Sequence, residues 1–210
     1  MRIDERRPDA RVSRTGRILL VAGLAAVGLT VAVFASRFGN SPEQGVPAVI
    51  DAPVPDLSLP YLEGEGMVGL HGLAGEYRVV VLNFFASWCL QCRNEHADLV
   101  STANAYRDRS VRFVGVAFQD QPDRAVDFLD ELGRGIAFDY VVDPGSLAAI
   151  EFGIVGVPET VFIAGGRIVG KLLGESDALT LSGAIEQILA GESVGARQVG
   201  EFRKGPDDRG

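Results

Sequence analysis

The chain has 210 residues, 47% of them hydrophobic, and a formal net charge of −8 at pH 7. This apolar content can build one domain of ordinary size without disulfide cross-links, so the two cysteines are not needed as scaffolding. Residues 1–37 carry seven arginines and three acidic side chains, a net +4, so the remaining residues carry −12. This acidity argues against a nucleic-acid-binding surface in the main domain, and we expect no nucleic-acid partner.

The N-terminal residues are divided by charge. We expect residues 1–17, with six arginines, to form a cytoplasmic basic segment and residues 18–36 to form a transmembrane anchor. Ile18 to Ala35 lack charge and proline, and as a helix they would span about 27 Å, close to the hydrocarbon core of about 30 Å. A cleaved signal peptide is the alternative, although its apolar core usually spans only about 7–15 residues. Both readings export the main domain, and the anchor predicts a single-pass protein of the inner (cytoplasmic) membrane whose domain faces the periplasm or cell exterior.

The rest of the chain is predicted to be a linker, a domain and a tail. Residues 37–50 are rich in Gly, Pro and Ser and predict a linker, whereas the polar, Gly-rich residues 192–210 predict a disordered tail. Residues 51–191 predict two short strands at 54–59 and 67–70, followed by strand–helix–strand–helix–strand–helix–hairpin–helix. These later elements are expected at 79–85, 90–106, 111–118, 122–132, 137–142, 146–152, 161–164 with 168–173, and 177–190. This order predicts an α/β fold of thioredoxin type, with a mixed central sheet and helices on both faces.

The two cysteines lie where a predicted strand turns into a predicted helix. Cys89 and Cys92 are separated by two residues and follow Trp88. Amide N–H groups and the positive end of the dipole at a helix N-terminus favour a thiolate over a thiol, so the first cysteine becomes the nucleophile. The position predicts a thiol–disulfide exchange site with a redox-active disulfide between Cys89 and Cys92.

Other uses of a Cys-x-x-Cys pair fit less well. Zinc needs about four ligands, and the chain has only His71 and His96 besides the cysteines, so we expect no metal. Covalent haem attachment needs histidine directly after the second cysteine, where Arg93 stands. A peroxidase of the alkyl-peroxide type would not use two such close cysteines. An inert disulfide is the remaining alternative.

Two carboxylates and one proline are candidate partners of the pair. Glu95 lies one helical turn past Cys92, and a partly buried carboxyl there would have a raised pKa and could exchange a proton with the Cys92 thiol. A solvated helix glutamate is an equal alternative. Pro158 enters a strand, which is unusual because proline lacks the N–H that pairs with a neighbouring strand. An ordinary proline of an edge strand is an equal alternative. Glu159 follows it as a second, weaker candidate carboxylate.

Two blocks of sequence resemble the membrane-anchored TlpA/ResA-like thioredoxins, and most closely their cytochrome c maturation branch, CcmG/DsbE. The first block, from Asn83 to His96, contains Trp-Cys-x-x-Cys-Arg-x-Glu-His. The second, from Gly153 to Thr160, reads Gly-x-x-Gly-Val-Pro-Glu-Thr and is the more specific of the two. The likeness extends over about residues 45–190 and includes the predicted anchor.

The resemblance implies a thiol:disulfide oxidoreductase of low potential, without cofactor, that reduces the disulfide in the Cys-x-x-Cys-His motif of apocytochrome c. A membrane thiol reductase of DsbD or CcdA type would supply its electrons. Cys89 would attack and Cys92 would resolve the mixed disulfide. Glu95 matches the family's active-site acid, and Pro158 matches a cis proline whose preceding backbone pairs with the substrate. The substrate-binding residues are then expected to be Trp88, Val157, Pro158 and Glu159.

Three positions depart from related patterns. Asn83 stands six residues before the first cysteine, where thioredoxin proper has a buried carboxylate, and Ala97 replaces the proline that kinks the first helix. Gln91 replaces the frequent Pro or Thr, which leaves the redox potential open. Two other functions stay open: a general extracytoplasmic reductase of ResA/TlpA type that serves substrates such as copper-site assembly proteins, and a non-catalytic binding module for a haem or metal chaperone.

Overall fold

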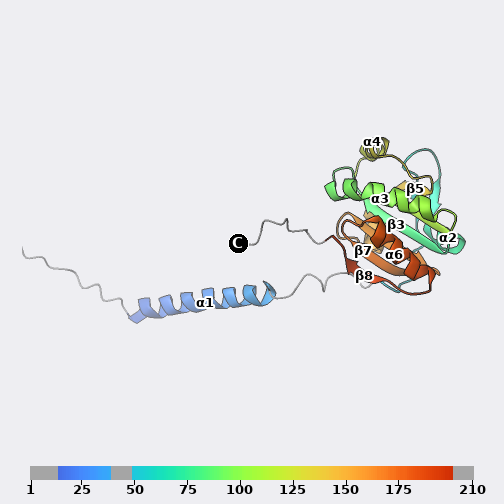
Figure 1. Ribbon diagram of the computed structural model, residues 1–210. Helices are drawn as coiled ribbons and strands as arrows, with labels where there is room; N and C mark the ends of the chain where they lie inside the picture. Colours follow the sequence, from blue (N-terminus) through green and yellow to red (C-terminus); the bar gives the residue numbers. More distant parts are fainter. Residues whose placement is uncertain (1–13, 39–48, 201–210) are drawn as a thin grey trace, which may run out of the picture. The chain divides into compact units, whose positions relative to one another are not determined.

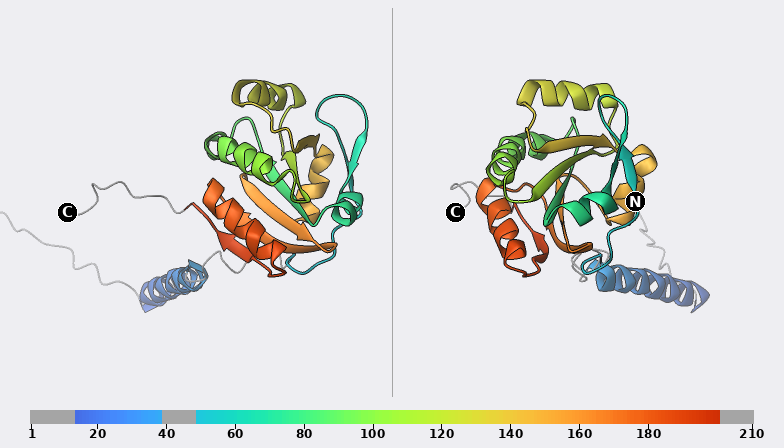
Figure 2. Two further views of the ribbon diagram at one scale, coloured as in Figure 1. Left: turned by 45° about the vertical axis from the view of Figure 1, so that its right-hand side comes forward. Right: turned by 90° about the vertical axis from the view of Figure 1, so that its right-hand side faces the viewer.

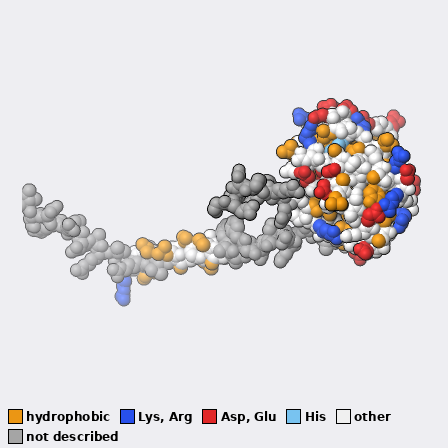
Figure 3. Space-filling model, viewed as in Figure 1, with side chains coloured by type: hydrophobic (Ala, Val, Ile, Leu, Met, Phe, Trp, Pro, Cys, Tyr) orange, Lys and Arg blue, Asp and Glu red, His pale blue; other side chains and the backbone are white. Residues whose placement is uncertain are grey.

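The computed structural model describes residues 14–38 and 49–200, and the chain divides into two compact units, 1–46 and 47–210 (Figure 1). In the first unit, helix α1 (Arg14–Phe38) carries exposed hydrophobic side chains (Figure 3). Among the described residues, no helix is both long and apolar enough to cross a membrane. The expected transmembrane anchor therefore stays a prediction, and most of the basic segment and of the linker lies outside the described residues.

The second unit is built on a six-stranded mixed sheet with the strand order β5-β4-β3-β6-β7-β8. Its strands are β3 (Val79–Phe85), β4 (Val111–Ala117), β5 (Phe138–Val142), β6 (Glu159–Ala164), β7 (Arg167–Leu173) and β8 (Gly195–Gln198). The first three are parallel, and β6 runs antiparallel to both β3 and β7, as the predicted hairpin requires. All seven residues of β3 are buried, which is what a continuous apolar run predicts for a central strand covered on both faces. The predicted mixed α/β sheet is confirmed.

Helices cover both faces of this sheet (Figure 2). They are α2 (Leu70–Glu76), α3 (Leu90–Tyr106), α4 (Pro122–Leu132), α5 (Leu147–Glu151) and α6 (Ala178–Leu189), with a 3-10 turn η2 (Pro144–Ser146) before α5. Alternate residues of β3 point to opposite faces. Val79 and Val81 pack in the core formed with α3 and α6, whereas Val80, Leu82 and Phe84 pack in the core formed with α2 and α5.

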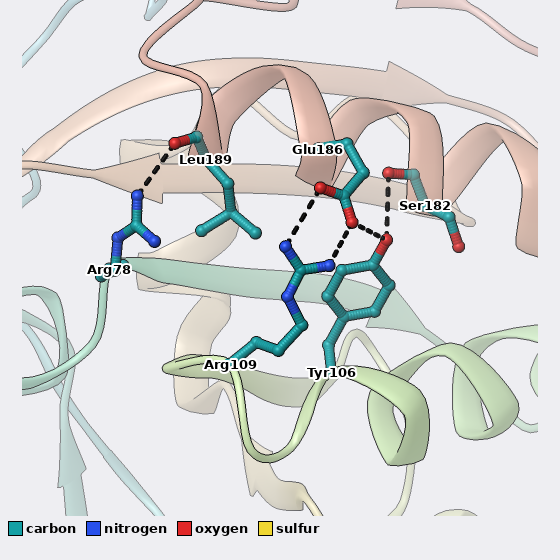
Figure 4. A network of polar contacts seen from close by, with 6 residues as sticks. All are labelled: Arg78, Tyr106, Arg109, Ser182, Glu186 and Leu189. Carbon is teal, nitrogen blue, oxygen red and sulfur yellow. Dashed lines mark hydrogen bonds and ion pairs between the residues drawn. The ribbon is translucent and has the colours of Figure 1, made fainter.

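A polar network joins α6 to the C-terminal end of α3 and the start of β3 (Figure 4). The Arg109 guanidinium forms a two-point ion pair with Glu186, and the Tyr106 hydroxyl donates to the same carboxylate over 2.7 Å. Arg78 donates to the Leu189 carbonyl over 2.9 Å. These contacts fix α6 beside the helix that begins at the cysteine pair.

Three elements differ from the sequence prediction. The sequence does not predict helix α2, because two of its seven residues are glycine, and it forms by burying Leu70 and Ala74. The disordered tail predicted from residue 192 is wrong at its start, because β8 pairs with β7 in parallel and Val194 is buried. This edge strand pairs with β7 through backbone hydrogen bonds. Such bonds do not depend on side-chain type, so the sequence of β8 shows no hydrophobic pattern. The first strand is shorter than predicted, since β1 (Ser58–Pro60) pairs with β2 (Met67–Gly69) in a separate small sheet.

Candidate active site

The cysteine pair lies at the junction of β3 and α3, as predicted. Cys89 is the N-cap residue of α3 and is joined to Cys92 by a disulfide; both residues are buried. The backbone N–H of Cys92 points at Cys89 Sγ over 3.0 Å. Because this N–H and the helix dipole favour negative charge on that sulfur, reduction would leave the thiolate preferentially on Cys89.

The second sequence block meets the pair from the neighbouring strand. The peptide bond between Val157 and Pro158 is cis, and the Val157 carbonyl oxygen lies 3.6 Å from Cys89 Sγ. Pro158 is buried and Val157 half-buried. The geometry brings together Cys89 and a short stretch of backbone beside which an extended chain could lie.

Trp88 is 61% exposed at the edge of the pair, and its indole N–H donates to the Gln119 carbonyl over 3.2 Å. The loop that carries it is fixed by Asp120, whose carboxylate accepts from the backbone N–H and the hydroxyl of Ser87. Sequence reasoning assigned no role to Asp120. Its signal in the sequence was its position shortly after the second buried strand, where polar side chains often line functional sites in α/β folds.

Glu95 is 1% exposed, so it is a buried carboxyl and not a solvated helix glutamate. One of its carboxylate oxygens accepts from the Asn83 amide over 2.8 Å, and the other accepts from the Ser176 backbone N–H over 2.9 Å. Burial raises the pKa of Glu95 to about 7, against the opposing effect of these two hydrogen bonds. Asn83, which cannot hold a proton itself, therefore positions the side chain that can.

Glu159 is also buried, at 3% exposure, and its carboxylate is turned into the protein. One oxygen accepts from the backbone N–H groups of Val155 and Gly156, over 3.0 and 3.1 Å. The other lies 2.7 Å from Lys171 Nζ, which also donates to the carbonyls of Phe152 and Gly153. Direct substrate contact by Glu159 does not fit this placement; the buried pair instead holds the loop that leads to the cis proline.

Of the two histidines considered as metal ligands, His96 has a different partner. His96 Nε2 lies 2.7 Å from the Gly133 carbonyl oxygen, to which it donates, and burial lowers the pKa of the ring. In the described part of the chain, no group of three His, Cys, Asp or Glu side chains is placed to hold a metal ion.

Comparison with known proteins assigns this site to a family. Residues 50–171 match the AhpC/TSA family, and this span is more than half of the chain. The chain belongs to the AhpC/TSA family. The matched span contains the cysteine pair and the cis proline, whereas Ser176, α6 and β8 lie beyond its end.

Individual relatives and solved structures agree. The thiol:disulfide interchange protein HelX of Rhodobacter capsulatus is 34% identical over 115 residues, which are 54% of this chain and 62% of HelX. The chain thus spans less than two thirds of that relative. DsbE of Allochromatium vinosum, also named a thiol:disulfide interchange protein, is 34% identical over 144 residues, 68% of this chain and 76% of DsbE. A putative DsbE structure from Chlorobium tepidum superposes with a TM-score of 0.58 at 26% identity, over 68% of this chain and 96% of that one. These matches support the predicted thioredoxin-like fold and the DsbE-like branch of the family.

Proposed function

We propose that this chain is a thiol:disulfide oxidoreductase that reduces the disulfide of apocytochrome c during cytochrome c biogenesis. The observation that carries the proposal is the buried Cys89–Cys92 disulfide at the start of α3, with the Val157 carbonyl 3.6 Å from Cys89 Sγ. The relatives named as thiol:disulfide interchange proteins support the same reaction.

The reaction runs in two exchanges. In the reduced protein, the Cys89 thiolate attacks one sulfur of the substrate disulfide, which breaks the substrate S–S bond and forms a mixed disulfide. Cys92 then gives up its proton and its thiolate attacks Cys89 Sγ, which releases the second substrate thiolate. The substrate gains two electrons and the Cys89–Cys92 pair loses them. Glu95, one turn beyond Cys92 on α3, is the buried carboxylate that would accept this proton.

Substrate would lie across the exposed side of the pair. Trp88 offers an exposed indole, and the backbone of Val157 before Pro158 offers a place for an extended chain. Glu159 acts indirectly, because its carboxylate holds the two residues before Val157. After each turnover, a membrane thiol reductase of DsbD or CcdA type would return two electrons to the oxidised pair.

The same proposal includes a membrane anchor. The uncharged stretch from Ile18 to Ala35 forms part of α1, whose exposed side chains include Leu20, Leu24, Val27, Leu29 and Val31. Together with the arginines before it, this supports a single-pass protein with a cytoplasmic N-terminus and a periplasm-facing domain.

Trapping the mixed disulfide tests the substrate. Reduced Cys92→Ser protein is expected to form a stable covalent adduct through Cys89 with an oxidised Cys-x-x-Cys-His peptide of apocytochrome c, because the resolving thiolate is missing. Mass spectrometry of non-reduced samples measures the adduct. Cys89→Ser is the matched control. It keeps the Cys92 thiol but lacks the attacking Cys89 thiol, so it should form little adduct.

Other outcomes point to other functions. Adducts formed in cells with unrelated proteins only would favour a general reductase, and a function that survives loss of both cysteines would favour a binding module. A reduction potential near that of DsbA, about −120 mV, would reverse the proposed direction of electron flow.

A further inference from the structure

The loop that leads to the cis proline, residues 152–157, lies beside a buried ion pair formed by two neighbouring strands. Glu159 of β6 is paired with Leu173 of β7, so Lys171, two residues earlier on β7, points to the same face of the sheet as Glu159. Diagonal neighbours on paired strands are within reach of such long side chains. Both side chains are buried, and Lys171 Nζ lies 2.7 Å from the Glu159 carboxylate. The register of the hairpin therefore places both charges next to the loop.

The ion pair binds the polar backbone groups of the loop. The Lys171 ammonium donates to the carbonyls of residues 152–153, and one Glu159 oxygen accepts from the N–H groups of residues 155–156. With the carboxylate as its third acceptor, all three donors of the ammonium are used. Moving the loop would leave buried charged groups without their partners, which is costly. The two side chains thus fix four peptide groups of the loop.

Val157, at the end of the loop, keeps its backbone groups for a partner. Within the described part of the chain, no hydrogen bond uses the Val157 N–H, and its carbonyl oxygen lies 3.6 Å from Cys89 Sγ. On its other side, the Pro158 carbonyl accepts from the Gly174 N–H over 2.9 Å. The backbone is therefore held before and after Val157, while Val157 itself can pair with an incoming chain beside the sulfur.

We propose that Lys171, acting with Glu159 through this loop, is a positioning residue that makes the protein select disulfides in extended polypeptides over small soluble disulfides. The inference rests on the proposed oxidoreductase function and deepens it. An extended polypeptide offers backbone N–H and C=O groups to Val157, as an added strand does at a sheet edge. A small disulfide has no such groups, so its reaction with Cys89 depends less on where the loop lies.

The test compares two uncharged disulfides: a capped, alanine-rich peptide with a Cys-Ala-Ala-Cys disulfide, and bis(2-hydroxyethyl) disulfide. The pre-reduced full chain is mixed with an excess of either one, without another reductant, and samples are quenched in acid. Thiol alkylation and mass spectrometry follow the oxidation of Cys89 and Cys92, and the dependence on disulfide concentration gives a rate constant for each compound. In Lys171→Met, we expect the ratio of the peptide rate constant to the small-disulfide rate constant to fall at least roughly tenfold, because one or two main-chain hydrogen bonds to Val157 are lost.

Two further variants separate position from stability, with circular dichroism showing that each protein is folded under the assay conditions. Arg112→Met breaks a two-point ion pair with Asp139 at the end of β4 that is farther from the cysteine pair, and it should keep the wild-type ratio. Lys171→Met with Glu159→Gln removes both charges of the buried pair, so no unpaired charge destabilises the fold. Its ratio should still fall at least roughly threefold, because nothing holds the carbonyls of residues 152–153.

Three results would overturn this inference alone: an equal loss for both disulfides in Lys171→Met, the same fall of the ratio in Arg112→Met, or a wild-type ratio in the double variant. The last would show that the loop needs a stable fold and not the ammonium group. A wild-type protein that reduced neither disulfide would overturn the oxidoreductase function and this inference with it.

Discussion

Replacing Lys171 by methionine is expected to lower the free energy of unfolding by about 3–5 kcal/mol. Lys171 is 0% exposed, and its Nζ lies 2.7 Å from a carboxylate oxygen of Glu159, itself 3% exposed. Methionine fills a similar volume but leaves that carboxylate buried without a cation and removes the donor to the carbonyls of Phe152 and Gly153. Urea unfolding at pH 7 measures the loss as a lower midpoint.

A double-mutant cycle separates the pair from its surroundings. Adding Glu159→Gln to Lys171→Met removes the unpaired charge while its side-chain carbonyl can still accept from Val155 and Gly156, so much of the lost stability should return. Arg107→Met breaks an ion pair between exposed side chains and should change stability by less than about 1 kcal/mol. A Lys171→Met variant no less stable than Arg107→Met would contradict the expected role of the buried pair.

The central part of the fold was predictable because its signals are local. β3 and β4 are continuous apolar runs, α4 begins with a proline and ends at Gly133, and the hairpin turns at Gly165 and Gly166. Helix α2 and strand β8 depend instead on the surfaces they meet. Their sequences contain glycines and few apolar residues, so no periodic pattern marked them.

The active site shows the same division. Cys89, Cys92 and Glu95 follow one another at intervals of three residues, and this local spacing made them candidates. Ser176 is separated from Glu95 by 81 positions. Lys171 belongs to β7, for which the sequence predicted a hairpin strand but no buried ion pair. Sequence spacing cannot show that a backbone N–H or a buried ammonium group from a distant strand reaches the site. The sequence showed that Asn83 stands where thioredoxin proper has a carboxylate. It did not show that the Asn83 amide contacts Glu95.

Glu95 should make the stability of the domain depend on pH. Its pKa is about 7 in the folded protein against 4.5 ordinarily, so folding favours the protonated form. The associated stability is then fully present below about pH 4.5 and is lost as the pH rises through 7. This pKa difference corresponds to a loss of about 3 kcal/mol in the free energy of unfolding between pH 4.5 and 8. Urea midpoints of Glu95→Gln should lack this loss, while the exposed control Glu65→Gln should retain it. Parallel pH profiles for the wild type and Glu95→Gln would contradict the buried, proton-binding carboxylate.

The same substitution should slow the second exchange. Above pH 7 the ionised Glu95 can take the proton of Cys92, and glutamine cannot, so release of the mixed disulfide should fall by on the order of 10²-fold in Glu95→Gln. The wild-type release rate should rise through a step near pH 7, and the variant should lose that step. Stopped-flow measurement of release from a preformed mixed disulfide isolates this exchange from the attack by Cys89. A variant that is slower at every pH but keeps the step near pH 7 would contradict this role. The step would then come from another group, and Glu95 would only support the structure of the site.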